Sequence, residues 1–262
     1  MGLRVAAACV TFETVKVTSP IAYMGKVDRV YLLHYIQSDE MGVENIYGSF
    51  YQEVVRQLRE EQGIEDIRPV WVKVYRFPDV LREVVAILSA ERDEGNSVYV
   101  NISAGPNEYA AAAAIASMMV ENARPFTVGT EAYQVPEEDL TIYFEGNSPV
   151  GMSKKVFDPR DLPCFHIDMP EQDVVRGLRV LGTRLEKGHR TSYAAMIGAL
   201  KDEGCWERPP EEDARGVTQA EKMYYSRHFI REWTENDWVV RDRRGRLELT
   251  DDGRTVTSVF YV

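Results

Sequence analysis

The stretch VYVNISAGPNEYAAAAAIASMM, residues 98–119, carries the clearest structural signal in the sequence. An apolar, β-branched run ends at residues 101–103, a Gly105-Pro106 turn follows, and a helix of small residues begins at once. A strand that passes through such a turn into a helix points free backbone N–H groups and the positive end of the helix dipole at the space above the sheet. This pattern predicts a binding loop at residues 103–107, and it is equally compatible with a plain strand-to-helix connection.

Five other short apolar runs in the first 150 residues have the same β-branched character. Helical patterns lie between several of them, with apolar residues spaced by about 3.6 positions at residues 47–62 and 78–93, each followed by a glycine. Alternation of strands and helices predicts a mostly parallel, Rossmann-like sheet with helices on both faces, here over residues 1–150. The five runs are residues 3–10, 29–34, 70–75, 125–128 and 140–144.

Composition excludes several classes of protein. Hydrophobic residues make up 44% of the 262 positions, which is ordinary for a globular protein. No apolar run of membrane-spanning length occurs, and the first ten residues lack the pattern of a signal peptide. The three cysteines and four histidines lack the spacing of metal ligands or of a disulfide framework, so we expect neither a metal site nor disulfides. We therefore expect a cytoplasmic protein with no membrane partner.

The sequence after residue 150 has a different character. A stretch rich in turn residues without a period begins at residue 146 and predicts a linker, which we place at 151–170. Three helical patterns follow at 171–187, 192–203 and 219–236, with Met223, Ile230 and Trp233 on one face of the third. Two short extended runs, 238–241 and 246–250, flank an Arg-Gly turn. Three helices and a hairpin form the order of a winged-helix domain, which we expect over residues 171–262.

Charge is distributed unevenly along the chain. The net charge is −11, yet residues 171–262 hold 16 basic and 17 acidic residues, so the acidity belongs to the first 170 positions. Four arginines flank the predicted hairpin turn, and they are typical of phosphate contacts to DNA, although a solvated basic turn would look the same. The preceding helix adds side chains off its apolar stripe that favour a contact surface for DNA or for a second subunit. The predicted DNA-binding residues are Lys222, Tyr224, Tyr225, His228, Arg231, Arg241, Arg243, Arg244 and Arg246.

The strand–NISAG–helix segment resembles the fourth-strand motif of CARF (CRISPR-associated Rossmann fold) domains. In the order of its parts, nearly the whole chain resembles the archaeal CARF–winged-helix transcriptional regulators. The resemblance implies a homodimer that binds a cyclic oligoadenylate or related nucleotide across its two-fold axis. One departure is that Asn107 and Glu108 stand where many CARF domains have a lysine or arginine.

The resemblance also implies which residues hold the ligand. They are the loop after the first strand and the loop after the fourth, with no required cofactor beyond the nucleotide itself. The implied ligand-binding residues are Thr11, Phe12, Glu13, Asn101, Ser103, Ala104, Gly105, Pro106 and Asn107.

Three functions remain open at this point. The first is a ligand-responsive transcriptional regulator whose partners are DNA, a nucleotide second messenger and a second copy of the chain. The second is a ring nuclease that cleaves its own cyclic nucleotide, for which the two loops offer only Glu13 and Glu108 as bases. The third is a module that binds a partner protein. Because the sequence carries no nucleophile-elbow, phosphate-binding-loop or dinucleotide-binding motif, we favour the regulator and expect no enzymatic activity.

Overall fold

The computed structural model describes residues 2–36, 45–135, 143–145, 148–207, 216–243 and 245–262. The chain divides into two units, Met1–Asp168 and Met169–Val262. Each unit has its own core of buried apolar side chains. None of the helices in the described part of the chain is long and apolar enough to cross a membrane.

The N-terminal unit is built around a six-stranded sheet with the order β10-β5-β4-β1-β2-β3. All neighbouring strands are parallel except the edge pair β10–β5. The mostly parallel α/β sheet predicted from the sequence is therefore present. Its strands are β1 (Arg4–Cys9), β2 (Arg29–His34), β3 (Asp66–Trp71), β4 (Ser97–Asn101), β5 (Ala123–Thr127) and β10 (Arg160–Asp161).

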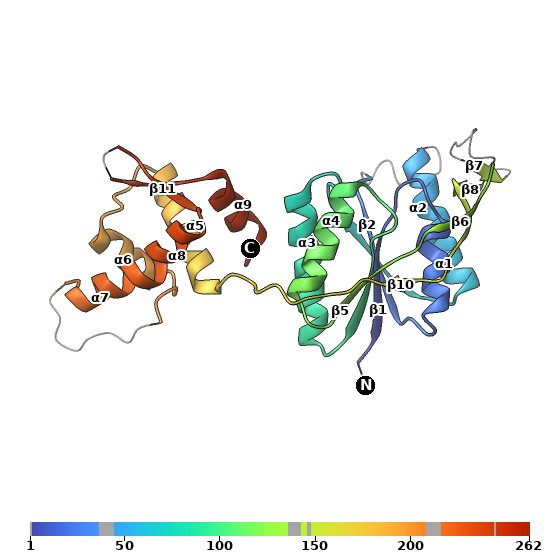
Figure 1. The fold of residues 1–262 in the computed structure, drawn as a ribbon, viewed down its shortest axis with the longest axis horizontal. Coiled ribbons are helices and arrows are strands. Elements are labelled where there is room, and N and C mark those ends of the chain that lie inside the picture. Colours follow the sequence, from blue (N-terminus) through green and yellow to red (C-terminus); the bar gives the residue numbers. More distant parts are fainter. Residues whose placement is uncertain (1, 37–44, 136–142, 146–147, 208–215, 244) are drawn as a thin grey trace. The chain divides into compact units, whose positions relative to one another are not determined.

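Helices cover both faces of this sheet, so the unit has three layers (Figure 1). α1 (Val15–Tyr23) and α2 (Ile46–Arg56), which continues as a π-helical turn at Gln57–Glu61, lie on one face. α3 (Phe77–Asp93) and α4 (Asn107–Met119) lie side by side on the other. On the first face, apolar residues of β1 and β2 pack against both helices around Phe50 and Leu58, which gives the sheet its buried core.

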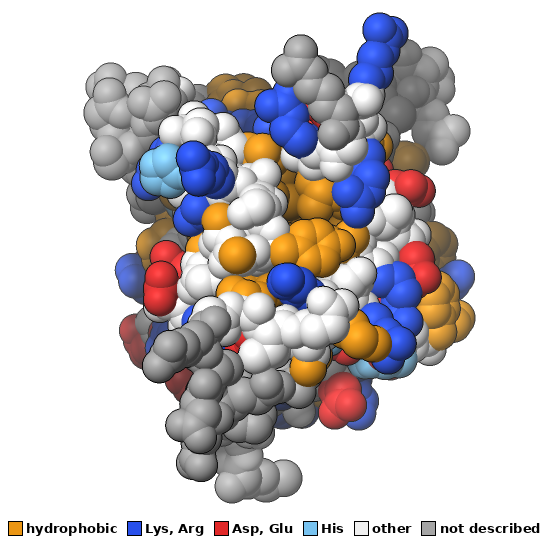
Figure 2. Space-filling model, turned by 90° about the vertical axis from the view of Figure 1, so that its left-hand side faces the viewer, with side chains coloured by type: hydrophobic (Ala, Val, Ile, Leu, Met, Phe, Trp, Pro, Cys, Tyr) orange, Lys and Arg blue, Asp and Glu red, His pale blue; other side chains and the backbone are white. Residues whose placement is uncertain are grey.

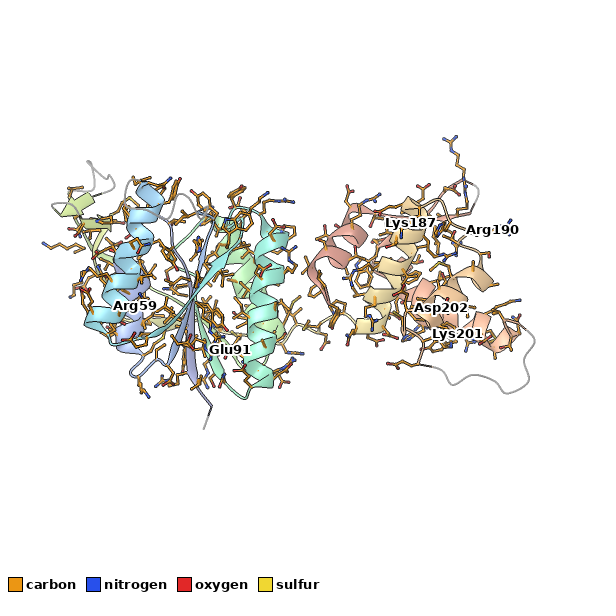
Figure 3. The ribbon with its side chains drawn as sticks, turned by 180° about the vertical axis from the view of Figure 1, so that it is seen from behind. Arg59, Glu91, Lys187, Arg190, Lys201 and Asp202 are labelled. Atoms are coloured by element: carbon orange, nitrogen blue, oxygen red, sulfur yellow. The ribbon has the colours of Figure 1, made fainter. Side chains whose placement is uncertain are left out.

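A polar network at the amino edge of the sheet joins α3 to β2, to β3 and to the residue before β4. The Glu91 side chain is buried and accepts hydrogen bonds from Arg29 Nη1 at 2.7 Å and from Tyr31 Oη at 2.6 Å. Asn96 Nδ2 donates to the same carboxylate at 2.6 Å, while Arg29 Nε donates to Asp66 at 2.7 Å. Figure 3 labels Glu91 near this end of the sheet. The network satisfies each of these buried charges with a partner.

Two predictions about the N-terminal unit are wrong in their bounds. The third strand is β3 at Asp66–Trp71, not residues 70–75, because pairing with β2 sets its register and an edge strand need not be apolar.

The stretch predicted as a linker at 151–170 contains β9 (Ser153–Val156) and β10. β9 pairs with β6 (Thr130–Tyr133), and β7 (Tyr143–Glu145) pairs with β8 (Ser148–Gly151). Part of the predicted strand at 140–144 lies outside the described residues.

The C-terminal unit contains the predicted order of helices and hairpin. α5 (Gln172–Glu186) and α6 (Tyr193–Asp202) precede a long third helix, and β11 (Val239–Arg241) pairs with β12 (Leu247–Leu249) in an antiparallel hairpin. A further helix, α9 (Asp251–Val259), is absent from the sequence prediction. Its first turn is capped by the Thr250 side chain, which accepts from Gly253 N. Around Trp233 and Phe229 the helices enclose a single core.

The third helix is not a regular α-helix, and this corrects its predicted face. It runs as α7 (Gln219–Tyr224), a π-helical segment at Tyr225–Ile230, and α8 (Arg231–Glu235). A π-helix makes i→i+5 bonds and so shifts the positions that face the core. Met223, predicted on the apolar stripe, is 44% exposed, whereas Tyr225, predicted on the contact surface, is 1% exposed.

Candidate functional site

The loops after β1 and β4 meet at the carboxyl edge of the sheet. The two strands are adjacent and parallel, with Ala8 opposite Asn101, so residues 10–14 and 102–106 leave the sheet at the same edge. Strand order reverses here, because β2 and β3 follow on one side of β1 while β4 and β5 lie on the other. In open α/β sheets this reversal is where ligands bind. The fold therefore brings together the two loops in which the sequence analysis placed the ligand.

Asn101 and Ser103 hold the second loop in shape. Asn101 is buried, its Nδ2 donates to Lys16 O at 2.8 Å, and its Oδ1 accepts from Ser103 N at 2.9 Å. The Ser103 hydroxyl oxygen accepts from Val128 N at 2.6 Å. These hydrogen bonds hold the loop against α1 and against the end of β5. The next residues include Gly105, which is exposed.

Gly105 is the point where this loop comes closest to β1. It adopts φ +104°, and a Cβ at this position would lie 2.7 Å from Cys9 Sγ and 3.1 Å from the Tyr109 ring. Cys9 is buried, and burial raises the pKa of its thiol, so it acts as an apolar floor rather than a nucleophile. Gly105 and Asn107 are exposed, while Ala104 is buried and Pro106 half-buried. The result is an open backbone surface at the start of α4.

In the first loop, Glu13 is turned into the protein. Its carboxylate accepts from Ser153 Oγ at 3.1 Å and from Ser153 N at 3.4 Å, and it lies 3.9 Å from Lys16 Nζ. Burial raises the pKa of Glu13, and the Lys16 charge partly offsets this effect. Glu13 therefore anchors β9, whereas Thr11 and Phe12 are half-buried at the edge.

A group of aromatic side chains beside these loops is absent from the sequence prediction. The Phe12 and Tyr47 ring centroids are 4.4 Å apart, those of Tyr35 and Tyr47 are 4.9 Å apart, and those of Tyr35 and Tyr75 are 5.9 Å apart. Tyr75 is 54% exposed. Burial and the hydrogen bond with Tyr47 raise the pKa of Tyr35, so it stays neutral. We call Tyr35, Tyr47 and Tyr75 the tyrosine rim.

A sequence signal for the tyrosine rim does exist. Tyr35 directly follows β2, and Tyr75 lies in the loop that follows β3, at the same carboxyl edge. Lys73 and Arg76 also stand in the loop after β3 and bring positive charge to this edge. Aromatic faces stack on nucleobases, and backbone N–H groups with nearby cations bind phosphate, so this arrangement suits a nucleotide.

The predicted DNA surface is only partly assembled. Tyr225 is buried, while Tyr224 is half-buried and stacks on His228 with ring centroids 4.9 Å apart. His228 Nε2 lies 2.5 Å from Asp173 Oδ2, and Arg231 Nη2 lies 3.2 Å from a Glu232 carboxylate oxygen. Lys222 is half-buried. Acidic neighbours thus offset two of the predicted cationic contacts.

The hairpin arginines differ from one another in whether an acidic side chain lies beside them. Arg241 and Arg243 are exposed, and Arg241 Nη1 donates to Gly245 O at 3.0 Å. Arg246 Nε lies 3.1 Å from Asp242 Oδ2. Arg244 lies outside the described residues. Figure 2 shows basic side chains around a central apolar group on the face that it displays.

One cluster of potential metal ligands forms despite the histidine spacing. Glu171, Asp173 and His228 place one ligand atom each within 4.8 Å of one another. The two carboxylates flank the start of α5, whose positive end already stabilises them. His228 Nε2 is hydrogen-bonded to Asp173 Oδ2, so two of the three potential ligand atoms already contact each other directly.

The chain is similar to one family model and to a set of solved structures. A family model described as "HFX_2341_N:-like, N-terminal" matches residues 4–133, which include β1 to β5 and both loops. No curated protein matches the sequence. Among solved structures, Can2 from Sulfobacillus thermosulfidooxidans in complex with cyclic tetra-adenylate is 14% identical, with a TM-score of 0.38 over 97% of this chain and 63% of its own.

Two further solved structures are similar at the same level. Csm6 from Enterococcus italicus, bound to cyclic hexa-2'-fluoro-hexa-dAMP, is 11% identical, with a TM-score of 0.41 over 79% of this chain and 50% of its own. Protein VC1899 from Vibrio cholerae is 11% identical, with a TM-score of 0.38 over 98% of this chain and 64% of its own. The chain spans less than two thirds of the length of each of these structures.

Proposed function

We propose that the protein is a ligand-responsive transcriptional regulator. In this proposal the N-terminal unit binds a cyclic oligoadenylate or a related nucleotide at the carboxyl edge of its sheet. The C-terminal unit, with its three helices and hairpin, acts as a winged helix that binds DNA. Binding of the nucleotide to the N-terminal unit changes the affinity of the C-terminal unit for DNA, which is a coupling free energy between the two sites.

The observation that carries the proposal is the junction of the β1 and β4 loops beside the tyrosine rim. At this junction Gly105 is exposed, two residues before α4 begins at Asn107. Free N–H groups at a helix start bind phosphate oxygens. Tyr75 offers an exposed ring for a base. The resemblance of residues 98–119 to the CARF motif supports the same class of ligand.

The proposal includes a homodimer with the ligand on the two-fold axis. A cyclic oligoadenylate is itself symmetric, so a site shared by two copies would give equivalent contacts to its halves. α4 supports close pairing, because its surface carries small side chains from Ala110, Ala111 and Ala114. Light scattering of the full chain with and without ligand checks this part.

The direct test is calorimetric titration of the full chain with cyclic tetra-adenylate. Tyr75→Ala should weaken binding by about tenfold, since one base-stacking contact contributes about 1–3 kcal/mol. Tyr23→Ala is the matched control, because Tyr23 is 58% exposed at the end of α1, away from this edge. Equal losses in the two variants would contradict the site, and no binding to the wild type would remove the ligand class.

DNA binding needs a separate measurement. Fluorescence anisotropy with a duplex from the promoter beside the protein's own gene, at low salt, should show binding whose affinity changes when cyclic tetra-adenylate is added. A protein that binds the nucleotide but no DNA would instead support a partner-protein role for the C-terminal unit. Breakdown of the nucleotide during the titration would support a ring nuclease.

A further inference from the structure

A concave surface lies within the C-terminal unit, and none of the predicted DNA-contact residues lines it. It is a hollow of about 450 Å³ between α5 and the end of α6. Four cationic side chains line it, namely Arg176, Arg179, Arg184 and Lys187, together with the acidic Asp202 and Glu203. Figure 3 labels Lys187 and Arg190 near the end of α5, and Lys201 and Asp202 on the end of α6. We call this surface the α5–α6 groove.

The hydrogen bonds of these cations go to carbonyl oxygens. Arg176 Nη2 donates to Glu203 O at 2.8 Å, and Arg184 Nη2 donates to Arg190 O at 2.8 Å. Arg179 donates to the carbonyls of Thr257, Phe260 and Tyr261 at 2.7–3.2 Å. A carbonyl oxygen accepts a hydrogen bond but carries no net charge, so these bonds fix the guanidinium groups without neutralising them.

A lack of direct ion pairs distinguishes the groove cations from the predicted DNA surface, although Asp202 and Glu203 also line the groove. Among the described residues, the four groove cations have no carboxylate within ion-pair distance, whereas His228, Arg231 and Arg246 each have at least one. The like charges also repel one another. The pKa of Arg179 is lowered mainly by burial and, in second place, by the positive charge of Arg176. Binding of an anion would relieve this repulsion.

The spacing of the cations shows what shape of anion fits. Arg176 and Lys187 lie at opposite ends of one face of α5, eleven residues apart, which corresponds to about 16 Å at 1.5 Å per residue. Arg184 and the partly buried Arg179 lie between them. A single small anion would reach only part of this row. A chain of phosphates would contact its whole length, because a nucleic-acid strand carries one phosphate per about 3.4 Å of axis.

We propose that the α5–α6 groove binds phosphate groups in a row, supplied either by the backbone of duplex DNA or by a free polyphosphate or nucleotide. The proposal deepens the proposed function, since duplex DNA is one of these two sources. It places the phosphate contacts on α5 rather than on the hairpin arginines.

The test compares two double variants of the full chain with the wild type. Arg176→Gln with Lys187→Gln removes one charge from each end of the groove. Arg227→Gln with Arg254→Gln is the matched control, because both residues are exposed, do not line the groove and are not among the predicted DNA-binding residues. Lys187→Gln alone is a second groove variant that removes no hydrogen bond seen in the structure. Circular dichroism verifies folding of each.

With labelled duplex DNA, the slope of log affinity against log salt should become shallower by about 2 units in the groove variant, at about 0.9 per phosphate. The control should keep the wild-type slope. Titration with sodium tripolyphosphate forms the second arm. Binding that Lys187→Gln weakens at least threefold, without duplex binding, assigns the groove to free phosphates.

Two outcomes would overturn the inference. One is duplex binding whose slope is the same in the groove variant as in the wild type, which places the phosphate contacts outside the groove. The other is a wild-type protein that binds neither duplex nor tripolyphosphate. Both are distinct from failure of the sensor, because binding of cyclic tetra-adenylate is measured on the other unit.

Discussion

The two edges of the N-terminal sheet differ in how their polar groups are hydrogen-bonded. At the amino edge, Glu91 is 1% exposed and accepts hydrogen bonds from three side chains, so the charges there satisfy one another. At the carboxyl edge, the polar atoms of Asn101 and Ser103 support a loop whose outer backbone stays open beside the tyrosine rim. A saturated polar edge stabilises the fold, and an open one is available to a ligand. Substitutions at the two edges should therefore separate stability from binding.

The largest expected effect is on stability, at the amino edge. Glu91→Ala removes one of the two carboxylates that lie 2.7 Å from the buried Arg29, and breaking a buried ion pair costs about 3–5 kcal/mol. Thermal unfolding should shift downward by about 10 °C for a loss of this size. Affinity for cyclic tetra-adenylate, measured well below that transition, should stay within twofold of the wild type. A weaker ligand with an unchanged melting temperature would reverse the roles of the two edges.

A smaller effect on stability, but a large one on binding, is expected at Gly105. Gly105→Val places a branched side chain at φ +104° against Cys9, with a cost of about 1–3 kcal/mol for the backbone alone. Gly95→Val is the control at the amino edge, because Gly95 has φ +76° with no atom within 4 Å of its Cβ position. Calorimetry should show ligand binding lost in the first variant and kept in the second. Loss in both would mean that the effect is unfolding rather than blockage.

The smallest expected effect is on the pH dependence of stability. Burial alone would raise the pKa of Glu91, but hydrogen bonds from Tyr31 and Arg29 outweigh it, so the pKa lies below the ordinary 4.5. A lowered folded-state pKa stabilises the fold above pH 4.5, and this contribution is lost as the pH falls through the folded-state value. Urea unfolding from pH 6 to pH 3 should therefore show a shallower acid loss in Glu91→Gln than in the wild type.

Glu13 provides the opposite sign at the other edge. Burial raises its pKa, so proton uptake below neutral pH favours the folded state. In the same urea series, Glu13→Gln should lose that gain, and its stability relative to the wild type should fall as the pH drops toward 4.5. Parallel curves for both variants and the wild type would contradict both assignments.

Local patterns predicted the regular elements well. β2 has its predicted bounds at Arg29–His34, and α3 begins one residue before the predicted start at residue 78. These elements are long or strongly apolar, so their own residues determine them. The strands β9 and β10 escaped prediction because their stability comes from β6 and β5, which lie over 20 residues away in sequence.

Those parts of the candidate site that depend on local sequence were predicted, and those that depend on contacts between distant segments were not. The Gly105 turn is a local signal, and parallel strands bring the Thr11 loop beside it. The tyrosine rim joins the loops after β2 and β3 to the first turn of α2, so no single stretch of sequence reveals it. Tyr225 was misplaced because a helical period of 3.6 was applied across a π-helical segment, which the residues themselves do not announce.

That segment also has a consequence for how the protein tolerates changes in length. A π-helical turn holds one residue more than an α-helical turn, so loss of one codon within Tyr225–Ile230 would leave a continuous α-helix rather than a break. Because the wide turn accommodates the extra residue, the residues on either side would keep their orientation relative to one another. Met223 would stay on the surface while Trp233 stayed in the core. The helix could thus lose one residue in a single evolutionary step without exchanging its exposed and buried faces.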